Sequence, residues 1–361
     1  MALNHSIIFL LYALLHSIVT FSQQEKKVKR FRVSPLPVIY YSPETRFGFG
    51  GLLAANFHTA KDSVTTGSYL QSSLLYTVNS QYAWGNSGRI YSPQNKHIFQ
   101  YRFYLAFFPE FFYGYQTEEP KNYKDPIEYN RLWFEFRKYW RVRNHLYLGF
   151  YGRFNRIFNV QSEEDGSLEM TKPPGYNGYY VAGFSPALNY DSRNSQVYPL
   201  QGYYLELLWT AHPGFMSEHT FGNFKLDART YRPLKRIKEG VIAFQLLLNL
   251  NQGDVPFKDM AEIGGADLMR GYYRGYYRYK NYYAFQMEFR MMVSDRFGFA
   301  AWVGGALNSD QWYEPFQHPL RPNGGIGLRV RINKLDKLNI RGDFGVGHEQ
   351  NGFYLDVAEA F

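Results

Sequence analysis

The segment that decides the fold is Tyr283–Met291, YAFQMEFRM. Every odd-numbered position in it is aromatic or apolar, whereas the even-numbered positions hold alanine, glutamine, glutamate and arginine. Successive side chains of a β-strand point to opposite faces, so this alternation predicts a strand with one apolar face and one polar face. Residues 326–332 and 338–346 repeat the pattern, with arginine, asparagine, aspartate or glycine on the polar face.

The number and spacing of such segments indicate a barrel. A soluble β-sandwich would also bury an apolar face, and a single strand cannot separate the two folds. From Pro35 onward, however, about sixteen such segments follow one another, joined alternately by short turns and long loops. The long loops are 109–130, 159–178, 251–279 and 308–321. This habit is typical of outer-membrane proteins, so the sequence predicts an all-β fold, a transmembrane antiparallel β-barrel of about 16 strands.

The composition limits the other classes of protein. The chain has no cysteine, so disulfides do not stabilise it, and no apolar run after the first segment reaches the ~18 residues of a transmembrane helix. The formal net charge of +9 could indicate a nucleic-acid partner. The basic residues, however, mostly alternate with apolar ones along the chain, which places them on one face of strands. No nucleic-acid partner is therefore expected.

The beginning of the chain has the features of a secretory signal peptide. An apolar run from Ile7 to about Phe21 is followed by small and polar residues, which indicates a signal peptide over residues 1–22. No lysine or arginine precedes the run, so a retained membrane anchor is the alternative. We expect residues 23–32 to form a short basic periplasmic leader and residues 33–361 to form the barrel, with no room for a periplasmic domain.

Four stretches resemble the BamA/TamA superfamily of outer-membrane assembly and translocation barrels. They are similar to its opening hairpin, its mid-barrel turn, the signature of its sixth extracellular loop and its last three strands. In order they are Val38–Gly51, Ser185–Leu207, Gly264–Tyr272 followed by Glu288, and 324–361. In the second stretch the residues that stand in the family's order are Asp191, Arg193, Pro199 and Gly202.

The resemblance implies that the long sixth extracellular loop folds into the barrel lumen, where an Arg-Gly tip contacts acidic residues of the inner wall. The sequence holds Arg-Gly-Tyr-Tyr twice, in LMRGYYRGYYRYK. Arg270 follows the GGADLM lead-in and matches the family's arginine, with Gly271 and Tyr272 completing the motif, whereas Arg274 is expected in the body of the loop. A guanidinium suits the task because it binds a carboxylate through two parallel hydrogen bonds.

The partner of Arg270 must lie on the lumen-facing phase of a strand, and Glu288 does. The family usually places a second acid on the following strand, but Gly304 stands at the matching position of WVGGA. Glu288 therefore carries the contact alone, or Asp343 contributes. The alternative is that Arg270 is a solvated loop residue.

The two ends of the barrel segment suggest a weak seam. Pro35 and Pro37 have no N–H for a strand ladder, and proline is normally confined to sheet edges. The resemblance implies a lateral gate between the first and last strands, for which a weak closure is suited. Phe361 lies in phase with the apolar residues before it, as in a terminal strand. The alternative is that both prolines precede the strand, in an extended leader.

By resemblance, the function is insertion or translocation of outer-membrane or surface proteins in the outer membrane of a Gram-negative bacterium. The expected partners are outer-membrane lipid and lipopolysaccharide, client polypeptides, and a periplasmic or lipoprotein partner in place of the family's POTRA domains. A docking subunit of an envelope complex and a loop-gated pore are the alternatives. An enzyme is not expected, because the sequence lacks the GxSxG, P-loop and HExxH motifs. The nine histidines lack metal-ligand spacing, so no metal or cofactor is expected.

Overall fold

The computed structural model describes residues 31–62, 64–334 and 337–361, and these residues form one β-barrel with its loops. The predicted signal peptide over residues 1–22 lies outside the described residues. The first described strand starts at Phe31, the first described residue.

The described strands and short helices have the following bounds. The first strands are β1 (Phe31–Ser42), β2 (Arg46–Phe57), β3 (Ser68–Thr77), β4 (Tyr82–Tyr91), β5 (His97–Phe107), β6 (Glu110–Phe112), β7 (Asp125–Arg143), β8 (Leu146–Ser162) and β9 (Tyr179–Asp191). The later strands are β10 (Gly202–His212), β11 (Phe221–Leu234), β12 (Gly240–Gly253), β13 (Ala261–Glu262), β14 (Arg278–Tyr279), β15 (Asn281–Met292), β16 (Phe297–Ser309), β17 (Arg321–Asn333), β18 (Leu338–Gly347) and β19 (Gln350–Val357). The short helices are η1 (Pro93–Asn95), η2 (Pro120–Tyr123) and α2 (Ser167–Thr171).

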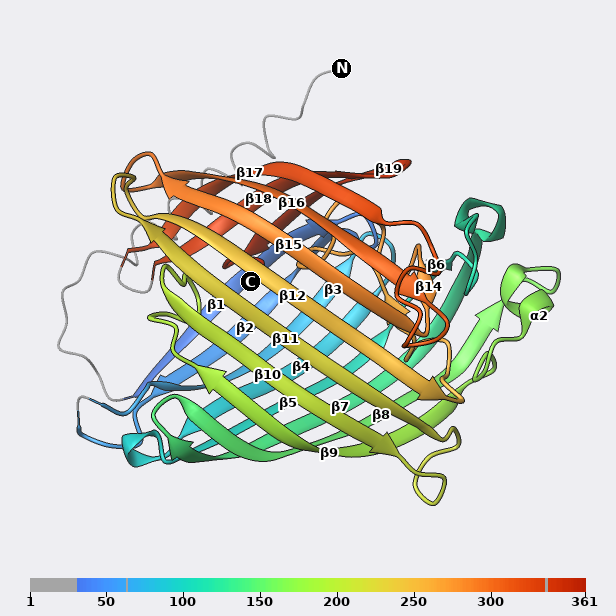
Figure 1. Ribbon diagram of the computed structural model, residues 1–361, viewed down its shortest axis with the longest axis horizontal. Coiled ribbons are helices and arrows are strands. Elements are labelled where there is room, and N and C mark those ends of the chain that lie inside the picture. Colours follow the sequence, from blue (N-terminus) through green and yellow to red (C-terminus); the bar gives the residue numbers. More distant parts are fainter. Residues whose placement is uncertain (1–30, 63, 335–336) are drawn as a thin grey trace.

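Each wall strand pairs in antiparallel fashion with the next, and β1 meets β19 to close the barrel. The sheet contains 17 strands, of which the three-residue β6 only extends an edge beside β7, so sixteen strands form the wall. Figure 1 shows these strands running obliquely around the barrel. The prediction of an all-β antiparallel barrel of about 16 strands is confirmed.

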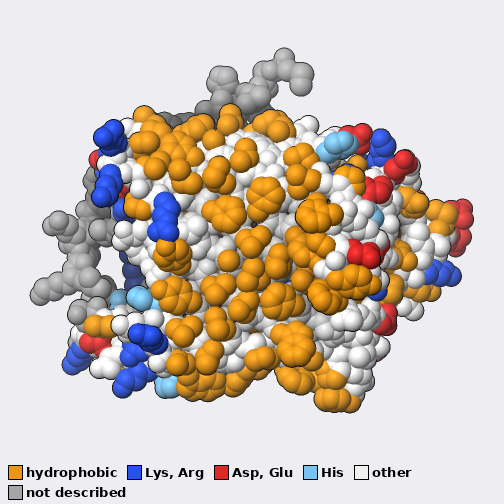
Figure 2. Space-filling view, in the orientation of Figure 1, with side chains coloured by type: hydrophobic (Ala, Val, Ile, Leu, Met, Phe, Trp, Pro, Cys, Tyr) orange, Lys and Arg blue, Asp and Glu red, His pale blue; other side chains and the backbone are white. Residues whose placement is uncertain are grey.

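The two faces of the wall have opposite chemistry. On β15, Phe285 and Met287 point outward and are 41% and 46% exposed, whereas Gln286 and Glu288 point inward and are fully buried. Figure 2 shows hydrophobic side chains covering the broad outer face, with the charged side chains gathered at its two ends. A soluble sandwich would hide its apolar face, so this arrangement is that of a membrane-spanning barrel. None of the described helices is long and apolar enough to span a membrane.

The connections differ in length at the two ends of the barrel. One end has short turns, such as 144–145 and 293–296, and the other carries the long loops 108–124, 163–178 and 254–280. By the habit of such barrels, the long-loop end is extracellular. The long strands β7 and β8 include residues that the sequence assigned to loops, because they continue their pairing above the rest of the wall.

The lumen is filled from both ends. At the extracellular end, residues of loop 254–280 form buried clusters with wall residues, and Val255, Phe257 and Ile263 have no exposed surface. At the periplasmic end, Tyr198 of the β9–β10 turn is buried, and Leu200 packs against a small apolar cluster. The predicted folding of the sixth extracellular loop into the lumen is confirmed.

Candidate functional site

The tip of loop 254–280 lies deep in the lumen and ends in the predicted motif. Arg270 is fully buried, as are its neighbours Met269 and Tyr272. A two-strand ladder between β13 and β14 holds the two arms of the loop together above the tip.

Arg270 lies in a pocket made by three barrel strands. Its Nη1 donates to Oδ2 of Asp343 on β18 at 2.6 Å, and its Nη2 donates to Oε2 of Glu288 on β15. The guanidinium also stacks on the ring of Trp302 on β16, 3.6 Å from the ring centre. The structure thus brings Arg270, Glu288 and Asp343 together, and both acids bind the arginine. Trp302, two residues before Gly304, supplies an aromatic face from the strand that lacks the expected acid.

The two acids also bind arginines of the wall. Glu288 Oε1 lies 3.4 Å from Arg290 and 3.7 Å from Arg329, and Asp343 accepts a hydrogen bond from Arg329 at 2.6 Å. All these side chains are buried, and a buried charge is tolerated only when it is paired. Removal of one member would therefore leave an opposite charge uncompensated.

The loop lead-in is bound to the same part of the wall. Arg341 of β18 donates to the carbonyl of Ala266 at 2.8 Å and to the carboxylate of Asp267 at 2.6 Å. Gln286 of β15 donates to the carbonyl of Asp267 at 2.9 Å. The GGADLM segment before the tip is therefore held by side chains of the strands that also supply the acids.

Glycines permit the close approach of loop and wall. Gly271 has φ +116°, and a Cβ there would lie 2.7 Å from the backbone carbon of Val346. A Cβ on Gly345 would lie 2.6 Å from the backbone carbon of Arg270, and one on Gly347 would lie 2.5 Å from the ring of Tyr272. The Arg-Gly-Tyr tip therefore rests directly on the bare backbone of β18.

Backbone N–H groups of the tip bind both sides of the seam between β1 and β19. On β19, the hydroxyl of Tyr354 accepts from Gly271 at 3.0 Å, and Gln350 accepts from the N–H of Tyr273 at 2.7 Å. In the β1–β2 turn, Glu44 Oε1 accepts from the N–H of Arg274 at 2.6 Å. The loop thus bridges the first and last strands at the extracellular end.

The sequence interpretation did not identify the three seam residues that hold the tip. Tyr354 gave only a weak signal, as a polar hydroxyl on the lumen-facing phase of the last strand. Glu44 and Gln350 lie in or beside turns, where alternation says nothing about direction.

The second Arg-Gly-Tyr-Tyr copy has a different environment. The Arg274 side chain is 65% exposed, and its Nε lies 3.4 Å from Glu262. Glu262 itself is bound by Lys258 at 2.8 Å and by Arg278 at 3.0 Å. Burial raises the pKa of the Glu262 carboxyl, but Lys258 and Arg278 outweigh it, so that the pKa falls below its usual value. Arg274 thus belongs to the body of the loop.

A second attachment joins the loop to the opposite wall. Asp259 accepts hydrogen bonds from Arg153 and, at 2.8 Å, from Asn155 on β8, and from the hydroxyl of Tyr179 on β9 at 2.6 Å. Burial raises the pKa of the Asp259 carboxyl, but Arg153 and Arg131 outweigh it and lower the pKa to about 2. The loop is therefore held by charged groups on two sides of the lumen.

The seam is narrow. All twelve residues of β1 pair with β2, whereas β1 and β19 share one register pair, Tyr41 opposite Leu355. Pro35 and Pro37 lie inside β1, so the alternative that they precede the strand is wrong. Below Tyr41, the edge of β1 has no further register partner on β19 among the described residues.

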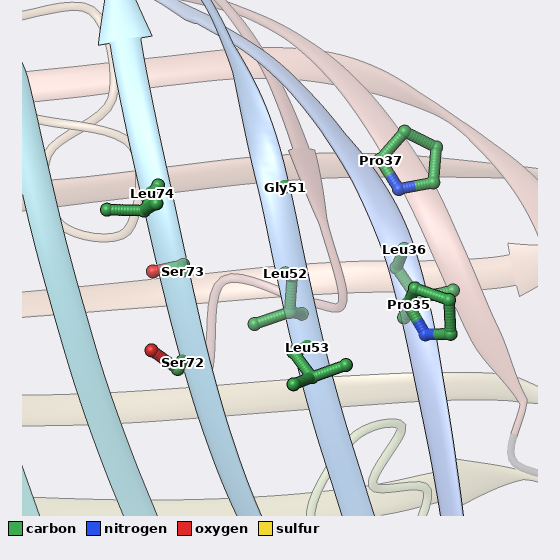
Figure 3. Close-up of a pocket in the computed structure, with 9 residues that line it drawn as sticks. All are labelled: Pro35, Leu36, Pro37, Gly51, Leu52, Leu53, Ser72, Ser73 and Leu74. Carbon is green, nitrogen blue, oxygen red and sulfur yellow. The ribbon is translucent and has the colours of Figure 1, made fainter.

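The outer surface beside this edge is hollowed. A groove of about 560 Å³ lies over Gly51, between the two prolines of β1 and Leu74 of β3 (Figure 3). No side chain projects from Gly51 to fill it, and a Cβ there would meet nothing within 4 Å. The groove belongs to the lipid-facing surface next to the seam.

Phe361 does not lie in the seam, so its predicted place in a terminal strand is wrong. β19 ends at Val357, and Ala358 has φ +70°, which turns the chain into the lumen. Phe361 is 4% exposed and packs against Tyr231, Val241 and Ala243. In the sequence, the alternation of apolar residues continues to Phe361, but the strand already ends at Val357.

The mid-barrel turn residues form a structural corner at the periplasmic mouth. Arg193 donates two hydrogen bonds to the carboxylate of Asp191, at 2.9 and 2.8 Å. Gly202 has φ +108°, and a Cβ there would lie 2.4 Å from the carbonyl oxygen of Ser192. Pro199 is buried in the same turn. These contacts fix the turn that covers the mouth, and they do not involve the loop tip.

The family can now be assigned. The protein-family model described as the Omp85 superfamily domain matches residues 66–361, most of the chain. The chain belongs to the Omp85 superfamily. The resemblance to BamA/TamA barrels is thereby confirmed at the level of the family. Comparison of this Omp85 barrel with curated proteins gives no match.

Solved structures share the fold of this Omp85 barrel. BamA from Haemophilus ducreyi lacking POTRA domains 1–3 has a TM-score of 0.57 and 14% identity, over 99% of this chain and 79% of that one. CdiB from Acinetobacter baumannii has a TM-score of 0.55 and 12% identity, over 91% of this chain and 60% of that one. CdiB from Escherichia coli has a TM-score of 0.56 and 10% identity, over 96% and 69%. At these identities the likeness is one of fold, and the Omp85 barrel spans less than two thirds of the A. baumannii CdiB chain.

Proposed function

We propose that this Omp85 barrel acts in, or is accessory to, the insertion or translocation of outer-membrane or surface proteins. The free edge of β1 carries the proposal. An unpaired strand edge presents rows of N–H and C=O groups that template another strand. Residues 31–40 offer such an edge, because the only described register pair between β1 and β19 is Tyr41 with Leu355.

The two prolines give this edge an unusual chemistry. Proline is tolerated in a strand where its nitrogen points away from the neighbouring strand, so the nitrogens of Pro35 and Pro37 face the free edge, away from β2. Along this stretch the edge offers carbonyl acceptors without the matching donors. A client strand would form fewer hydrogen bonds there than in a complete ladder, which suits a contact that must later be released.

The loop tip has a supporting role in this proposal. Its contacts with Tyr354, Gln350 and Glu44 hold the extracellular end of the seam together. Arg270, bound to Glu288 and Asp343, holds the tip in place. Opening of the seam would therefore begin at the periplasmic end, where the edge of β1 is free.

The proposed partners are those that this arrangement requires. The outer apolar band is suited to outer-membrane lipid, with lipopolysaccharide at the long-loop end. We also propose that a periplasmic or lipoprotein partner delivers clients to the free edge of β1. No catalytic step is needed for strand exchange, and we propose none. The filled lumen argues against the alternative of a loop-gated pore.

Site-specific photo-crosslinking in living cells tests the function. The crosslinker would be placed at Val38 and Tyr40 of β1 and at Leu355 and Val357 of β19. A matched control at Leu148 of β8 is likewise in the wall but far from the seam. We expect nascent outer-membrane proteins to be trapped from the seam positions and not from Leu148. Crosslinks to one constant partner would instead favour a docking subunit, and equal trapping at Leu148 would contradict the proposal.

A further inference from the structure

The last described residues leave the wall at the point where they would have completed the seam. In an antiparallel pair, one step forward on one strand matches one step back on the other. Continued from Tyr41 opposite Leu355, the register would place Glu359 opposite Pro37. Instead, β19 ends at Val357 and residues 358–361 turn into the lumen.

Two features make the extended position unfavourable. Pro37 has no N–H to offer the strand beside it. In the extended strand, Glu359 would also share the face of Leu355 and Val357, and Val357 is exposed on the outer surface. A carboxylate on the lipid-facing side of a barrel is costly. Pro37 on β1 and Glu359 after β19 therefore both disfavour extension of the seam.

The lumen, in contrast, provides a complete site for the same carboxylate. Glu359 accepts hydrogen bonds from Arg329 Nε at 2.7 Å and from Asn339 Nδ2 at 2.8 Å, and Arg290 lies 3.7 Å away. Its side chain is almost fully buried. Two residues later, Phe361 packs into the apolar cluster that also contacts Leu200.

This site belongs to the network that anchors the loop. Arg329 binds Glu359 through Nε and Asp343 through Nη1, and Arg290 lies beside both Glu359 and Glu288. Arg341, which lies 3.3 Å from Asp343, is also bound by Asp267 and Asp356. For the remaining arginines, Arg270, Arg290 and Arg329, Glu288 and Asp343 provide only two negative charges. Glu359 supplies the third negative charge.

We infer that Glu359 is a positioning residue that keeps the edge of β1 free. By binding Arg329 and Asn339 inside the barrel, it holds residues 358–361 away from the place that an incoming strand would take. The inference rests on the proposed function, since it names the element of this chain that competes for the same edge. It also predicts that extension of β19 along β1 requires loss of the Glu359 contacts.

Cysteine crosslinking can measure the position of these residues directly, because the chain has no cysteine of its own. Ala360→Cys would be present in all variants. Combined with Leu200→Cys it forms the lumen pair, since Ala360 and Leu200 pack against the same cluster. Combined with Leu36→Cys it forms the seam pair, because the continued register places residue 360 opposite Leu36. A short bis-maleimide would join either pair in purified, folded barrel.

With Glu359 present, we expect the lumen pair to crosslink and the seam pair not to crosslink. In Glu359→Gln, which removes the charge and keeps the size, crosslinking of the lumen pair should fall several-fold and that of the seam pair should rise. Glu359→Asp should preserve the wild-type preference. As a matched control, Glu349→Gln removes an exposed carboxylate that lies 3.4 Å from Lys121, and it should leave the preference unchanged.

An unchanged preference for the lumen pair in Glu359→Gln would overturn the inference. So would crosslinking of the seam pair in the presence of Glu359. Heat-modified mobility in detergent gels selects the folded barrel in every variant. No client takes part in this measurement, so its failure would leave the proposed function standing. Failure to trap clients from β1 would in turn leave the position of residues 358–361 unaffected.

Discussion

The hydroxyl of Tyr354 lies 3.0 Å from the backbone nitrogen of Gly271 and 3.2 Å from the carbonyl oxygen of Tyr272. One side chain of the last strand therefore binds the loop tip both as acceptor and as donor. The same tip reaches Glu44 beside the first strand. The loop tip is thus hydrogen-bonded to both sides of the seam, and substitutions can test the contribution of each contact separately.

Arg270→Ala should lower the heat resistance of the barrel in detergent gels. The substitution leaves Glu288 and Asp343 facing wall arginines without their shared partner, and removal of one member of a buried ionic group costs about 3–5 kcal/mol. Arg270→Lys should restore little, because an ammonium cannot bind two acids in one plane and stack on Trp302. Arg274→Ala, at an exposed position, should cost at most about 1 kcal/mol. Equal losses in both alanine variants would show that Arg270 is not the anchor.

Gly345→Ala should displace the loop tip, because the new Cβ would lie 2.6 Å from the backbone carbon of Arg270. Overpacking of this kind typically costs about 1–3 kcal/mol. The measurement is the rate of protease cleavage within loop 254–280, which should increase. Gly342→Ala on the same strand is the control, since its Cβ would meet its nearest neighbour at 3.8 Å. Resistance of Gly345→Ala equal to that of Gly342→Ala would contradict the close contact.

Tyr354→Phe should loosen the loop with little change in packing. It removes the hydroxyl that Gly271 and Tyr272 share, and a buried donor left without its partner costs about 1–3 kcal/mol. Hydrogen exchange at the amide of Gly271 should accelerate. Tyr76→Phe, on the exposed face of β3, should leave that amide unchanged. Unchanged exchange in Tyr354→Phe would mean that another group protects it.

Acid should release the Asp259 attachment within a defined pH range. Its folded-state pKa of about 2 lies below its usual value of 3.8, so the carboxylate contributes stability above pH ~4 that is lost as the pH falls towards 2. The shift corresponds to about 2 kcal/mol. Cleavage of loop 254–280 by pepsin should therefore rise between pH 4 and pH 2. Asp259→Asn should be cleaved faster at pH 4 and should lack the additional rise; a rise equal to that of the wild type would assign the effect to other groups.

A disulfide across the seam should block the proposed activity. Tyr41 and Leu355 are register partners, and the Cα atoms of such partners lie about 4.5–5.5 Å apart, within the reach of a disulfide. When oxidised, the double cysteine variant should still trap clients at the free edge of β1 but should lose their insertion into the membrane, and it should regain insertion when reduced. Cysteines in place of Ile39 and Phe49, partners on β1 and β2, should form a disulfide without this loss. Full activity of the oxidised seam variant would exclude opening at this place.

The wall of the barrel could be predicted from the sequence because its two faces have different surroundings. Lipid outside and polar groups inside impose a period of two, which identified residues 283–291 within β15 and 338–346 within β18. The tip residue could be chosen between two equal copies only because the GGADLM lead-in matches the family. Its surroundings on Trp302 and Asp343 depend on the stagger of strands distant in sequence, which alternation does not encode.

Phe361 shows where the period of two stops being informative. Its phase fits a lipid-facing strand, but phase describes direction only while the backbone remains extended. Ala358 turns the chain, and Glu359 binds Arg329 inside the lumen although apolar residues surround it in the sequence. The only sign of this turn in the sequence was Glu359, a carboxylate at an apolar position of VAEAF. Whether Glu359 faces the lipid or binds an arginine of the lumen depends on strands distant in sequence.

The segments inside the lumen also affect the path that a client polypeptide could take. Loop 254–280 occupies one mouth of the cylinder, and the β9–β10 turn with residues 358–361 occupies the other. A client that moved along the barrel axis would meet both of these segments. Exit past the free edge of β1 displaces neither, so the proposed function is better served by insertion into the bilayer than by translocation across it.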